Sequence, residues 1–470
     1  MTTSTGAHIL AFPYPAQGHM LPLLDLTHQL AIRGLTITLL ITPKNLPIIT
    51  PLLSTHPTSI TPLILPFPPH PSLPAGAENT KDIPIGSLRA MMRALGDLSY
   101  PITLWFNSHP SPPVAILSDF FLGWTQDLAS QLGIKRLVFS PSGAFAISII
   151  NSLWRDMPRR NGEEDTIIPF DNIPFSPKYP FSQVSTVFRF YVEGDPEMEF
   201  IKEGMKGNLK SWGIVLNSFS ELESVYLNHL KYELGNERVF AVGPLLPPND
   251  ASQERGFSSS VEVKDLLSFL DTCPDQSVVY ICFGSQAVLR NQQIKAIARG
   301  LEISGARFVW SIKQPTTGHV EGEYGTVPQG FEDRVADRGF VIKGWAPQVT
   351  ILTHRAVGSF LSHCGWNSIL ESLVAGKPML TWPMGADQFT NATLLVDRMK
   401  VAVRVCEGAG TIPDADKLAR KIKESVGGNR VLSLRAKELS EAALMAVKDG
   451  GSSCDDLNCL VRELNGLKAI

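Results

Sequence analysis

Residues 345–388 have the sequence WAPQVTILTHRAVGSFLSHCGWNSILESLVAGKPMLTWPMGADQ, and this stretch decides the fold of the second half of the chain. It contains a loop tryptophan, a short helix, a strand, a polar turn, a helix ended by Gly376 and another strand. An acid–amide pair, Asp387 and Gln388, closes it. No simple packing rule requires this order, so we interpret its polar turns through the chemistry of binding.

The polar turn leads from the predicted strand VGSFLSH into the helix SILESLVAG. It consists of Gly365, Trp366, Asn367 and Ser368. Backbone amides at a helix N-terminus attract phosphate groups, because their N–H bonds and the helix dipole both favour negative charge. His363 and the side chains of the turn can add hydrogen bonds, and Ser285 in FGSQ offers a similar turn. The segment therefore predicts a diphosphate site in which helix dipoles replace a metal cation.

Residues on either side of this turn suit the rest of a nucleotide. Glu371 lies one turn after Asn367, where a carboxylate can accept bonds from two ribose hydroxyls; it could also be an ordinary surface charge. Trp345 can stack on a base, with the Ala346 backbone and Gln348 beside it, although such a tryptophan is otherwise usually core. The closing acid–amide pair can bind several hydroxyls of an attached sugar.

The whole sequence has 470 residues, 44% apolar and 19% charged, with a net charge of −3. These values predict a soluble protein of two domains and argue against an electrostatic nucleic-acid binder. The N-terminal residues lack the pattern of a secretory signal, and no apolar run approaches the ~18 residues of a membrane span, so we expect a cytoplasmic protein. The six cysteines lack CxxC spacing, which indicates neither a disulfide framework nor a zinc site.

Strands alternate with helices in both halves of the chain. The first half opens with HILAF, a helix over about 22–33 and LTITLLIT, which together predict a βαβ unit. Further apolar strands are predicted at 61–67, 113–119, 135–141, 213–218 and 238–244. Such strands belong in a buried parallel sheet. Two Pro-rich segments, 66–74 and 168–180, look too irregular for regular structure and are predicted to be loops at a ligand mouth.

A second series of strands and helices begins at SVVYICFGS, residues 277–285. We predict an α/β fold of two Rossmann-like parallel-sheet domains facing a cleft, and a C-terminal helix that packs back on the first domain. The predicted bounds are 1–244 for the first domain, 245–260 for the linker, 261–450 for the second domain and 451–470 for the helix. Ligands of such sheets bind at the carboxyl ends of the strands.

Two residues of the first domain fall at such strand ends. His19 follows HILAF and precedes a predicted helix, and Asp119 ends PVAILSD. If the fourth strand lies beside the first, the carboxylate can hold the imidazole in one tautomer and make it a general base. Each could instead be a capping residue. A serine nucleophile is not indicated, because no G-x-S-x-G motif is present.

One acidic motif and one histidine favour structural roles. Asp414 and Asp416 form a D-x-D, which could hold a metal-bound sugar nucleotide, but its place at a helix start favours capping. His354 lies in a helical pattern and is expected to be a surface or capping residue. No metal ligand is therefore predicted.

The stretch 345–388 resembles, without a gap, the signature box of the plant secondary-product UDP-glycosyltransferases, a family of GT-B fold. FPYPAQGHMLPLLDL, GIVLNSFSELE, VFAVGPLLP and VVYICFGS add to the resemblance. It implies that the first domain binds an acceptor and the second a UDP-sugar. It also implies that His19, aided by Asp119, deprotonates the acceptor hydroxyl in one inverting displacement, with no metal and no cofactor beyond the UDP-sugar co-substrate.

The resemblance further implies a role for each residue of the box. Trp345 stacks on uracil, Ala346 and Gln348 contact base and ribose, and Glu371 holds the ribose hydroxyls. The diphosphate is implied to bind His363, Asn367, Ser368 and Ser285 beside Gly365, and the sugar to contact Trp366, Asp387 and Gln388. Gln388 resembles glucose users, whereas histidine there accompanies galactose or some rhamnose users, so UDP-glucose is the expected donor.

Within this family, the sequence looks nearest to a subgroup that acts on flavonols and hydroxybenzoates. Such acceptors suit a neutral histidine base, because phenols lose their protons more easily than aliphatic alcohols do. Candidate sugar or acceptor contacts, which could also be core, are Ser140, Phe120, Phe121, Phe145, Phe188, Phe190 and Tyr191. UDP-xylose or another donor with a terpenoid or hormone acceptor stays open. So do a nucleotide-sugar sensor and a glycoside hydrolase or phosphorylase, whose paired carboxylates would be Asp119 and Asp387. One complete site per chain makes a monomer sufficient.

Overall fold

The computed structural model describes residues 6–160, 162, 165–245, 259–315, 320, 322–426 and 430–467. These residues form two compact units, the first within Met1–Leu246 and Ala446–Ile470 and the second within Pro247–Met445. Most of the predicted linker, from 246 to 258, lies outside the described residues. No helix of the described chain is both long and apolar enough to cross a bilayer.

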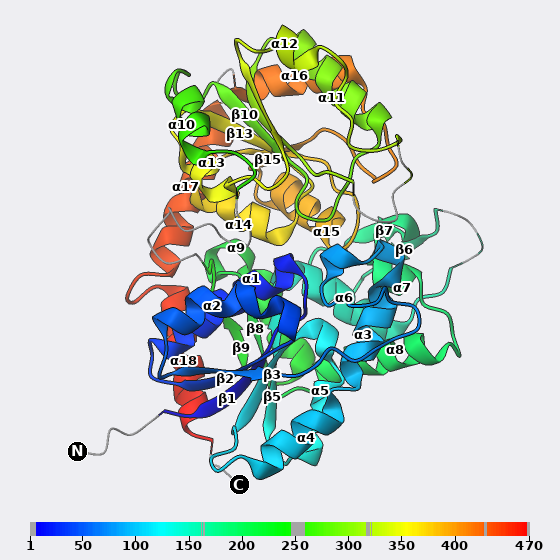
Figure 1. Ribbon diagram of the computed structural model, residues 1–470, viewed down its shortest axis with the longest axis vertical. Helices are drawn as coiled ribbons and strands as arrows, with labels where there is room; N and C mark the ends of the chain where they lie inside the picture. The colour runs from blue at the N-terminus through cyan, green and yellow to red at the C-terminus, as the bar shows by residue number, and fades with distance from the viewer. Residues whose placement is uncertain are drawn as a thin grey trace. The chain divides into compact units, whose positions relative to one another are not determined.

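The described part of the first unit contains a seven-stranded parallel sheet in the order β3-β2-β1-β4-β5-β8-β9 (Figure 1). Its strands are β1 (His8–Phe12), β2 (Thr36–Ile41), β3 (Ile60–Ile64), β4 (Ala115–Asp119), β5 (Lys135–Ser140), β8 (Gly213–Leu216) and β9 (Val239–Ala241). The fourth strand lies beside the first, which is the condition on which the pairing of His19 with Asp119 depends. Strand β1 pairs in parallel with β4 and places Phe12 opposite Ser118.

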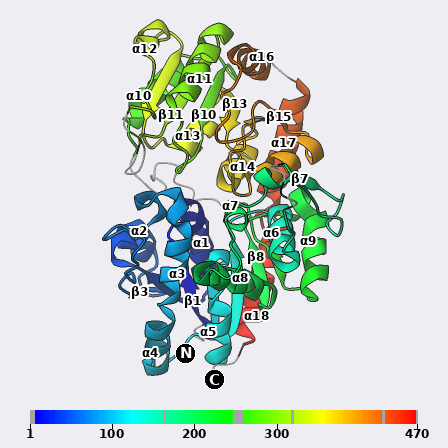
Figure 2. The same ribbon diagram turned by 90° about the vertical axis from the view of Figure 1, so that its right-hand side faces the viewer.

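Helices cover this sheet (Figures 1 and 2). They are α1 (Gln17–Ala31), α2 (Leu46–Thr55), α3 (Leu88–Gly96), α4 (Ser99–Ser108), α5 (Thr125–Gln131), α6 (Ala144–Asp156), α7 (Thr186–Arg189), α8 (Pro196–Leu209), α9 (Ser220–Leu234) and α18 (Ser452–Asn465). Alternate strand residues such as Ile9 and Leu117 share a core with α1 and α18. Because side chains alternate along a strand, Ser118 and Arg136 point to the opposite face.

The C-terminal helix α18 belongs to the first unit although it follows the second in sequence (Figure 1). Leu457, Leu460 and Leu464 of this helix join the core that contains the first strands. The carboxylate of Asp456 accepts a hydrogen bond of 2.8 Å from the backbone N–H of Ala241 in β9. Apolar contact and an edge hydrogen bond therefore hold the end of the chain against the first sheet.

Two predictions of secondary structure are wrong. Helix α1 begins at Gln17 and not at Pro22, because the Ala16 carbonyl accepts bonds from the N–H groups of His19 and Met20 and starts the helix earlier. The segment 168–180 is not wholly irregular. It contributes to a two-stranded antiparallel ribbon of β6 (Ile167–Pro169) and β7 (Lys178–Pro180), in which proline is tolerated because an edge position needs no N–H donor.

The described part of the second unit repeats the arrangement with a six-stranded parallel sheet in the order β12-β11-β10-β13-β14-β15. Its strands are β10 (Val278–Cys282), β11 (Arg307–Ile312), β12 (Gly339–Lys343), β13 (Val357–Ser362), β14 (Met379–Thr381) and β15 (Ala402–Arg404). Its core joins Ile281, Trp310 and Leu361 of the strands to Ile297 of α11 (Asn291–Ser304) and Leu418 of α16 (Ala415–Val426).

The helices of this series are α10 (Val263–Asp271), α11 (Asn291–Ser304), α12 (Phe331–Arg334), α13 (Gln348–Thr353), α14 (Trp366–Val374), α15 (Gln388–Thr393), α16 (Ala415–Val426) and α17 (Arg430–Ala446). The Asp414 carboxylate accepts a bond of 2.8 Å from the Lys417 N–H at the start of α16. The capping role predicted for this aspartate is therefore present in the fold.

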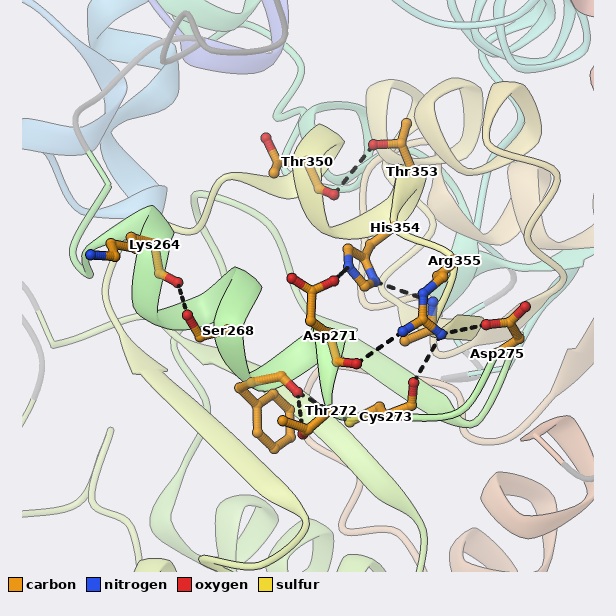
Figure 3. A network of polar contacts seen from close by, with 12 residues as sticks. Lys264, Ser268, Asp271, Thr272, Cys273, Asp275, Thr350, Thr353, His354 and Arg355 are labelled. Carbon is orange, nitrogen blue, oxygen red and sulfur yellow. Dashed lines mark hydrogen bonds and ion pairs between the residues drawn. The ribbon is translucent and has the colours of Figure 1, made fainter.

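A polar network fixes the chain where α13 leads into β13 (Figure 3). His354 is the C-cap of α13, as predicted, and its Nε2 lies 3.2 Å from Asp271 Oδ1 at the end of α10. The Arg355 guanidinium donates to the backbone carbonyls of Asp271 at 2.9 Å and Cys273 at 3.1 Å. Strand β13, which carries His363 beyond its far end, therefore starts from a constrained position.

Candidate active site

The first group of candidate residues lies at the carboxyl ends of β1 and β4. His19 occupies the first turn of α1, and Asp119 is the last residue of β4. Nδ1 of His19 lies 2.8 Å from Oδ2 of Asp119, which is the pairing that the sequence predicts. The Asp119 side chain is 0% exposed and that of His19 is 19% exposed. One edge of the His19 imidazole is therefore accessible, whereas the Asp119 carboxylate is shielded from solvent.

The second oxygen of Asp119 fixes the orientation of the carboxylate. It accepts a hydrogen bond of 2.9 Å from the Phe121 N–H. When Asp119 is ionised, it accepts the Nδ1–H of His19, so the lone pair of the imidazole lies on Nε2. An imidazole held in this way can take a proton from a hydroxyl group.

Aromatic rings surround the imidazole. It stacks on Phe121 with centroids 4.9 Å apart and on Phe120 at 5.6 Å, and the Tyr14 ring meets it edge-on at 5.4 Å. Burial and the charge of Asp119 both raise the pKa of Tyr14, so its phenol stays protonated at neutral pH. Of the predicted sugar or acceptor contacts, Phe120 and Phe121 are the two that touch His19 through these ring contacts.

The remaining aromatic candidates lie elsewhere in the first unit. Phe145 is buried and stacks on Tyr226 at 4.3 Å, and Phe188 is buried edge-on against Trp154. Phe190 is 58% exposed. Of the other candidates, Tyr191 donates to Glu199 Oε1 at 2.5 Å, and Ser140 is fully buried with its hydroxyl bonded to the Ser142 carbonyl. Phe145 and Phe188 thus have clear packing roles.

The second group of candidate residues follows β13 in the second unit. After His363 the backbone turns through Cys364, whose φ is +66°, to Gly365, the N-cap of α14. A Cβ atom on Gly365 would lie 2.5 Å from the imidazole of His363, and one on Gly284 would lie 2.6 Å from it. Both turns therefore need glycine, which lets two stretches of backbone approach the same ring.

Burial lowers the pKa of His363 to about 4, so this imidazole is neutral at physiological pH. It can still donate one N–H to a phosphate oxygen. The α14 N-terminus begins with Trp366, Asn367 and Ser368, and Ser285 directly follows Gly284 in the turn after β10. These groups provide the helix N-terminus and the polar turn that a diphosphate site requires.

Two residues predicted to contact the nucleoside, Gln348 and Glu371, are joined in one network with Ser368, which is predicted to bind the diphosphate. The Nε2 of Gln348 donates to Glu371 Oε2 at 2.7 Å and to Ser368 Oγ at 3.0 Å, and its Oε1 accepts from the Tyr280 hydroxyl at 3.3 Å. Tyr280 is fully buried and stacks on Phe360. Sequence reasoning missed Tyr280 because a tyrosine within an apolar strand looks like ordinary core.

The loop before α13 is tied to the start of the second unit. The backbone N–H of Trp345 donates to Ser260 Oγ at 2.7 Å, and the backbone N–H of Ser260 donates to the Trp345 carbonyl at 2.9 Å. The Ala346 carbonyl accepts the Gln348 N–H at 2.8 Å. The predicted base-reading residues therefore sit on a loop whose backbone is fixed on both sides of Trp345.

The acid–amide pair lies at the start of α15. Oε1 of Gln388 accepts the N–H groups of Met384 at 2.8 Å and Gly385 at 3.1 Å, so the carboxamide directs its N–H₂ away from this turn. Asp387 Oδ2 accepts from the Asn391 side chain at 3.0 Å, and the same amide donates to the Cys364 carbonyl at 3.0 Å. Buried Asn391, another residue that sequence reasoning missed, thus links Asp387 of the acid–amide pair, which is predicted to contact the sugar, to the turn before α14. The one indication of this role in the sequence is that Asn391 lies one helical turn after Asp387, where two side chains on the same face of a helix can meet.

Two Rossmann-like units, one with a part-buried histidine–aspartate pair and the other with a helix N-terminus suited to a diphosphate, are the arrangement expected of an enzyme that acts on nucleotide-activated substrates. Among the described residues, no group of three or more His, Cys, Asp or Glu side chains is placed to hold a metal ion.

Comparison with known proteins gives the family. The family model described as UDP-glucoronosyl and UDP-glucosyl transferase matches residues 258–418. UDP-glycosyltransferase 89B2 of Stevia rebaudiana is 58% identical over 465 residues, covering 98% of both chains. Flavonol 3-O-glucosyltransferase UGT89B1 of Arabidopsis thaliana is 53% identical over 468 residues, 98% of this chain and 97% of that one. The chain belongs to the plant UDP-glycosyltransferases and is an enzyme of that kind.

Solved structures support the same conclusion for the fold. The crystal structure of Arabidopsis thaliana UGT89C1 complexed with UDP-L-rhamnose matches with a TM-score of 0.82 and 38% identity over 98% of this chain and all of that one. The same protein complexed with quercetin matches with a TM-score of 0.79. The GT-B fold predicted from the sequence is thereby confirmed.

Proposed function

We propose that the enzyme transfers glucose from UDP-glucose to a hydroxyl of a flavonol or related phenol and forms a β-O-glucoside. The observation that carries the proposal is the 2.8 Å contact between His19 and the fully buried Asp119, which supplies a base for the hydroxyl. The name of the UGT89B1 relative, a flavonol 3-O-glucosyltransferase, supports both the donor and the acceptor. In this proposal the first unit binds the acceptor and the second the UDP-sugar.

The proposed reaction is a single displacement. Nε2 of His19 takes the proton of the acceptor hydroxyl, and the oxygen attacks the anomeric carbon of the sugar. The bond between that carbon and the β-phosphate oxygen breaks, and its electron pair leaves on UDP. Asp119 stabilises the imidazolium that forms. Attack opposite to the leaving group turns an α-linked donor into a β-linked product.

The second unit supplies the proposed groups for the donor. His363, Asn367, Ser368 and Ser285 bind the diphosphate beside Gly365, Trp345 stacks on uracil, Gln348 and Ala346 contact the nucleoside, Glu371 holds the ribose hydroxyls, and Trp366, Asp387 and Gln388 contact the sugar. A helix N-terminus and a neutral imidazole stabilise the negative charge that develops on the leaving diphosphate. The proposal gives this role to the protein rather than to a metal ion.

A second donor is a specific alternative. The 38% identical UGT89C1 was solved with UDP-L-rhamnose, so a deoxyhexose donor must be compared directly with glucose. A competition assay with equal amounts of UDP-glucose, UDP-rhamnose and UDP-xylose, with quercetin as acceptor, separates these donors by the mass of the product. UDP-galactose is assayed separately, because its product has the same mass as the glucoside and is distinguished from it by proton NMR. We expect the glucoside to dominate. A dominant rhamnoside or xyloside would contradict the donor assignment.

Replacing Gln388 with histidine is expected to lower kcat/KM for UDP-glucose by roughly fivefold to thirtyfold. The reason is the loss of one or two hydrogen bonds of about 1 kcal/mol each between its N–H₂ group and the sugar. Initial rates at varied UDP-glucose, with quercetin held constant, measure the change. The affinity for UDP alone, measured by calorimetry, is expected to stay the same, because UDP lacks the sugar.

The matched control is Gln388→Glu. A glutamate keeps the oxygen that accepts the N–H groups of Met384 and Gly385 but cannot donate to a sugar hydroxyl. We expect this variant to lose as much kcat/KM as the histidine variant. If Gln388→Glu retained the wild-type value, the side chain would serve only to hold its own turn.

A further inference from the structure

The side chains that the proposed function assigns to the diphosphate carry no positive charge. The two serines and the asparagine are neutral, and burial lowers the pKa of His363 to about 4, so its imidazole is neutral as well. The ionisable side chains assigned to the rest of the donor, Glu371 and Asp387, are carboxylates. A diphosphate is an anion, and it gains a further negative charge when UDP leaves. A nearby cation would therefore matter to both binding and reaction.

Cations stand at the ends of three strands of the second sheet. Lys343 is the last residue of β12, Arg404 is the last residue of β15, and Lys313 directly follows β11. The Lys343 ammonium lies 2.7 Å from Glu332 Oε1. The Arg404 guanidinium donates to Asp397 Oδ1 at 2.8 Å. Within the described part of the chain, Lys313 has no carboxylate partner of this kind. Its charge is the uncompensated one of the three.

The surroundings of Lys313 leave its ammonium short of both water and anions. Its Nζ donates to the backbone carbonyl of Gln286 at 3.4 Å, and its side chain is partly buried. This burial lowers the pKa of the ammonium, because a charged group that loses hydration without gaining an opposite charge is destabilised. A bound anion reverses that effect, since an opposite charge favours the protonated amine.

The ammonium lies next to the turn that carries Ser285. Strands β10 and β11 pair in parallel, with Ile281 opposite Trp310. Ser285 and Lys313 follow these partners beyond the same carboxyl edge of the sheet. The carbonyl that Nζ contacts belongs to Gln286, the residue directly after Ser285. The cation and the serine assigned to the diphosphate are therefore neighbours in space, although they come from different strands.

We propose that the Lys313 ammonium binds the diphosphate of the UDP-sugar beside Ser285 and stabilises the UDP that leaves. The inference rests on the proposed function in one respect, the assignment of the diphosphate to the Ser285 turn. When the bond between the anomeric carbon and the β-phosphate oxygen breaks, its electron pair stays on UDP. The ammonium therefore binds UDP more strongly than the intact UDP-sugar, which is the condition for accelerating the reaction.

The first test replaces Lys313 with methionine, which keeps the length of the side chain and removes its charge. Titration calorimetry should show that the Kd for UDP rises by roughly tenfold, near the lower end for a lost hydrogen bond to a charged group, because the ammonium is only partly buried. The Kd for UDP-glucose should rise less, since UDP-glucose carries one negative charge fewer. We expect kcat with quercetin to fall. Lys313→Arg keeps the charge and should bind UDP with an affinity close to that of the wild type.

The matched control is Lys343→Met. Lys343 ends the neighbouring strand, and Glu332 already neutralises its charge at 2.7 Å, so the Kd for UDP should stay the same. The dependence of the Kd on salt separates a charge from a merely structural role. Added NaCl should weaken UDP binding more steeply in the wild type than in Lys313→Met, because salt screens the lost attraction. An unchanged Kd in Lys313→Met, an equal loss in Lys313→Arg, or equal salt dependence would overturn the proposal.

A second measurement uses the wild-type protein and covers the case in which Lys313→Met does not fold. Formaldehyde with cyanoborohydride methylates accessible lysine amines, and mass spectrometry of peptides gives the extent at each lysine. Saturating UDP should slow the methylation of Lys313 and leave that of Lys343 unchanged. Uridine, which lacks the phosphates, should protect neither lysine. Equal methylation of Lys313 with and without UDP, or equal protection by uridine, would contradict a contact with the diphosphate.

These readouts separate the inference from the proposed function, because UDP binding and lysine protection need no sugar transfer. If UDP affinity depended on Lys313 but no glycoside formed with quercetin, the proposed function would fail and the inference would stand. If the quercetin β-glucoside formed and UDP affinity did not depend on Lys313, the inference alone would fail. A wild-type protein that bound no UDP would overturn both.

Discussion

Replacing His19 with alanine is expected to lower kcat for transfer to quercetin by roughly a hundredfold to ten-thousandfold, the usual contribution of general base catalysis. The imidazole edge that Asp119 leaves outward is the proposed acceptor of the phenol proton. Alanine removes that acceptor and leaves the second unit unchanged. Initial rates at saturating UDP-glucose measure the loss, and calorimetry with UDP should show wild-type affinity.

The acidity of the acceptor provides a sharper control. A nitrophenol is already largely ionised near neutral pH and needs little help from a base, so His19→Ala should lose much less activity toward it than toward quercetin. The difference between the two losses isolates proton removal from the binding of the acceptor. Undiminished transfer to quercetin, or equal losses with both phenols, would contradict the assignment of His19 as the base.

Replacing Glu371 with alanine is expected to raise the Kd for UDP by roughly tenfold to a hundredfold. A charge-assisted hydrogen bond contributes about 1.5 to 3 kcal/mol, and one such bond accounts for a change of this size. Glu371 Oε2 already accepts from Gln348 at 2.7 Å, which holds the carboxylate in place before any ligand binds. Titration calorimetry with UDP measures the change directly.

A ligand that lacks the ribose hydroxyls tests the reason for that loss. With 2′,3′-dideoxy-UDP, the wild type and Glu371→Ala should bind with similar affinity, because the proposed partners of the carboxylate are missing. If the variant lost equal affinity for both ligands, Glu371 would act by supporting Gln348 and Ser368. An unchanged Kd for UDP itself would remove its binding role altogether.

Much of the fold follows from local pattern. Runs such as HILAF and VVYIC are apolar without alternation, which identifies strands buried on both faces of a parallel sheet. Helix α11 likewise buries apolar residues at helical spacing, among them Ile294, Ile297 and Leu301. The start of α1 was misplaced because the rule that favours proline at the first helical turn does not prevent a helix from beginning earlier.

The parts of the candidate site that were predictable from the sequence are those formed by consecutive residues or by the ends of neighbouring strands. The turn before α14 is polar over consecutive residues, and the pairing of His19 with Asp119 follows from the order of two strands. Tyr280 and Asn391 were missed for a physical reason. Each acts through a buried hydrogen bond to a residue distant in sequence or on another element, and a buried polar side chain shows its partner only when the chain is folded.

The measurement that tests the central claim most directly is the product of the wild-type enzyme with UDP-glucose and quercetin. Mass spectrometry identifies the glycoside, proton NMR gives its anomeric configuration, and a UDP assay gives the stoichiometry. We predict a quercetin β-O-glucoside formed in equal amount to the UDP released. Absence of a glycoside with every UDP-sugar, an α-linked product, or cleavage of nitrophenyl glucoside without UDP would contradict the account.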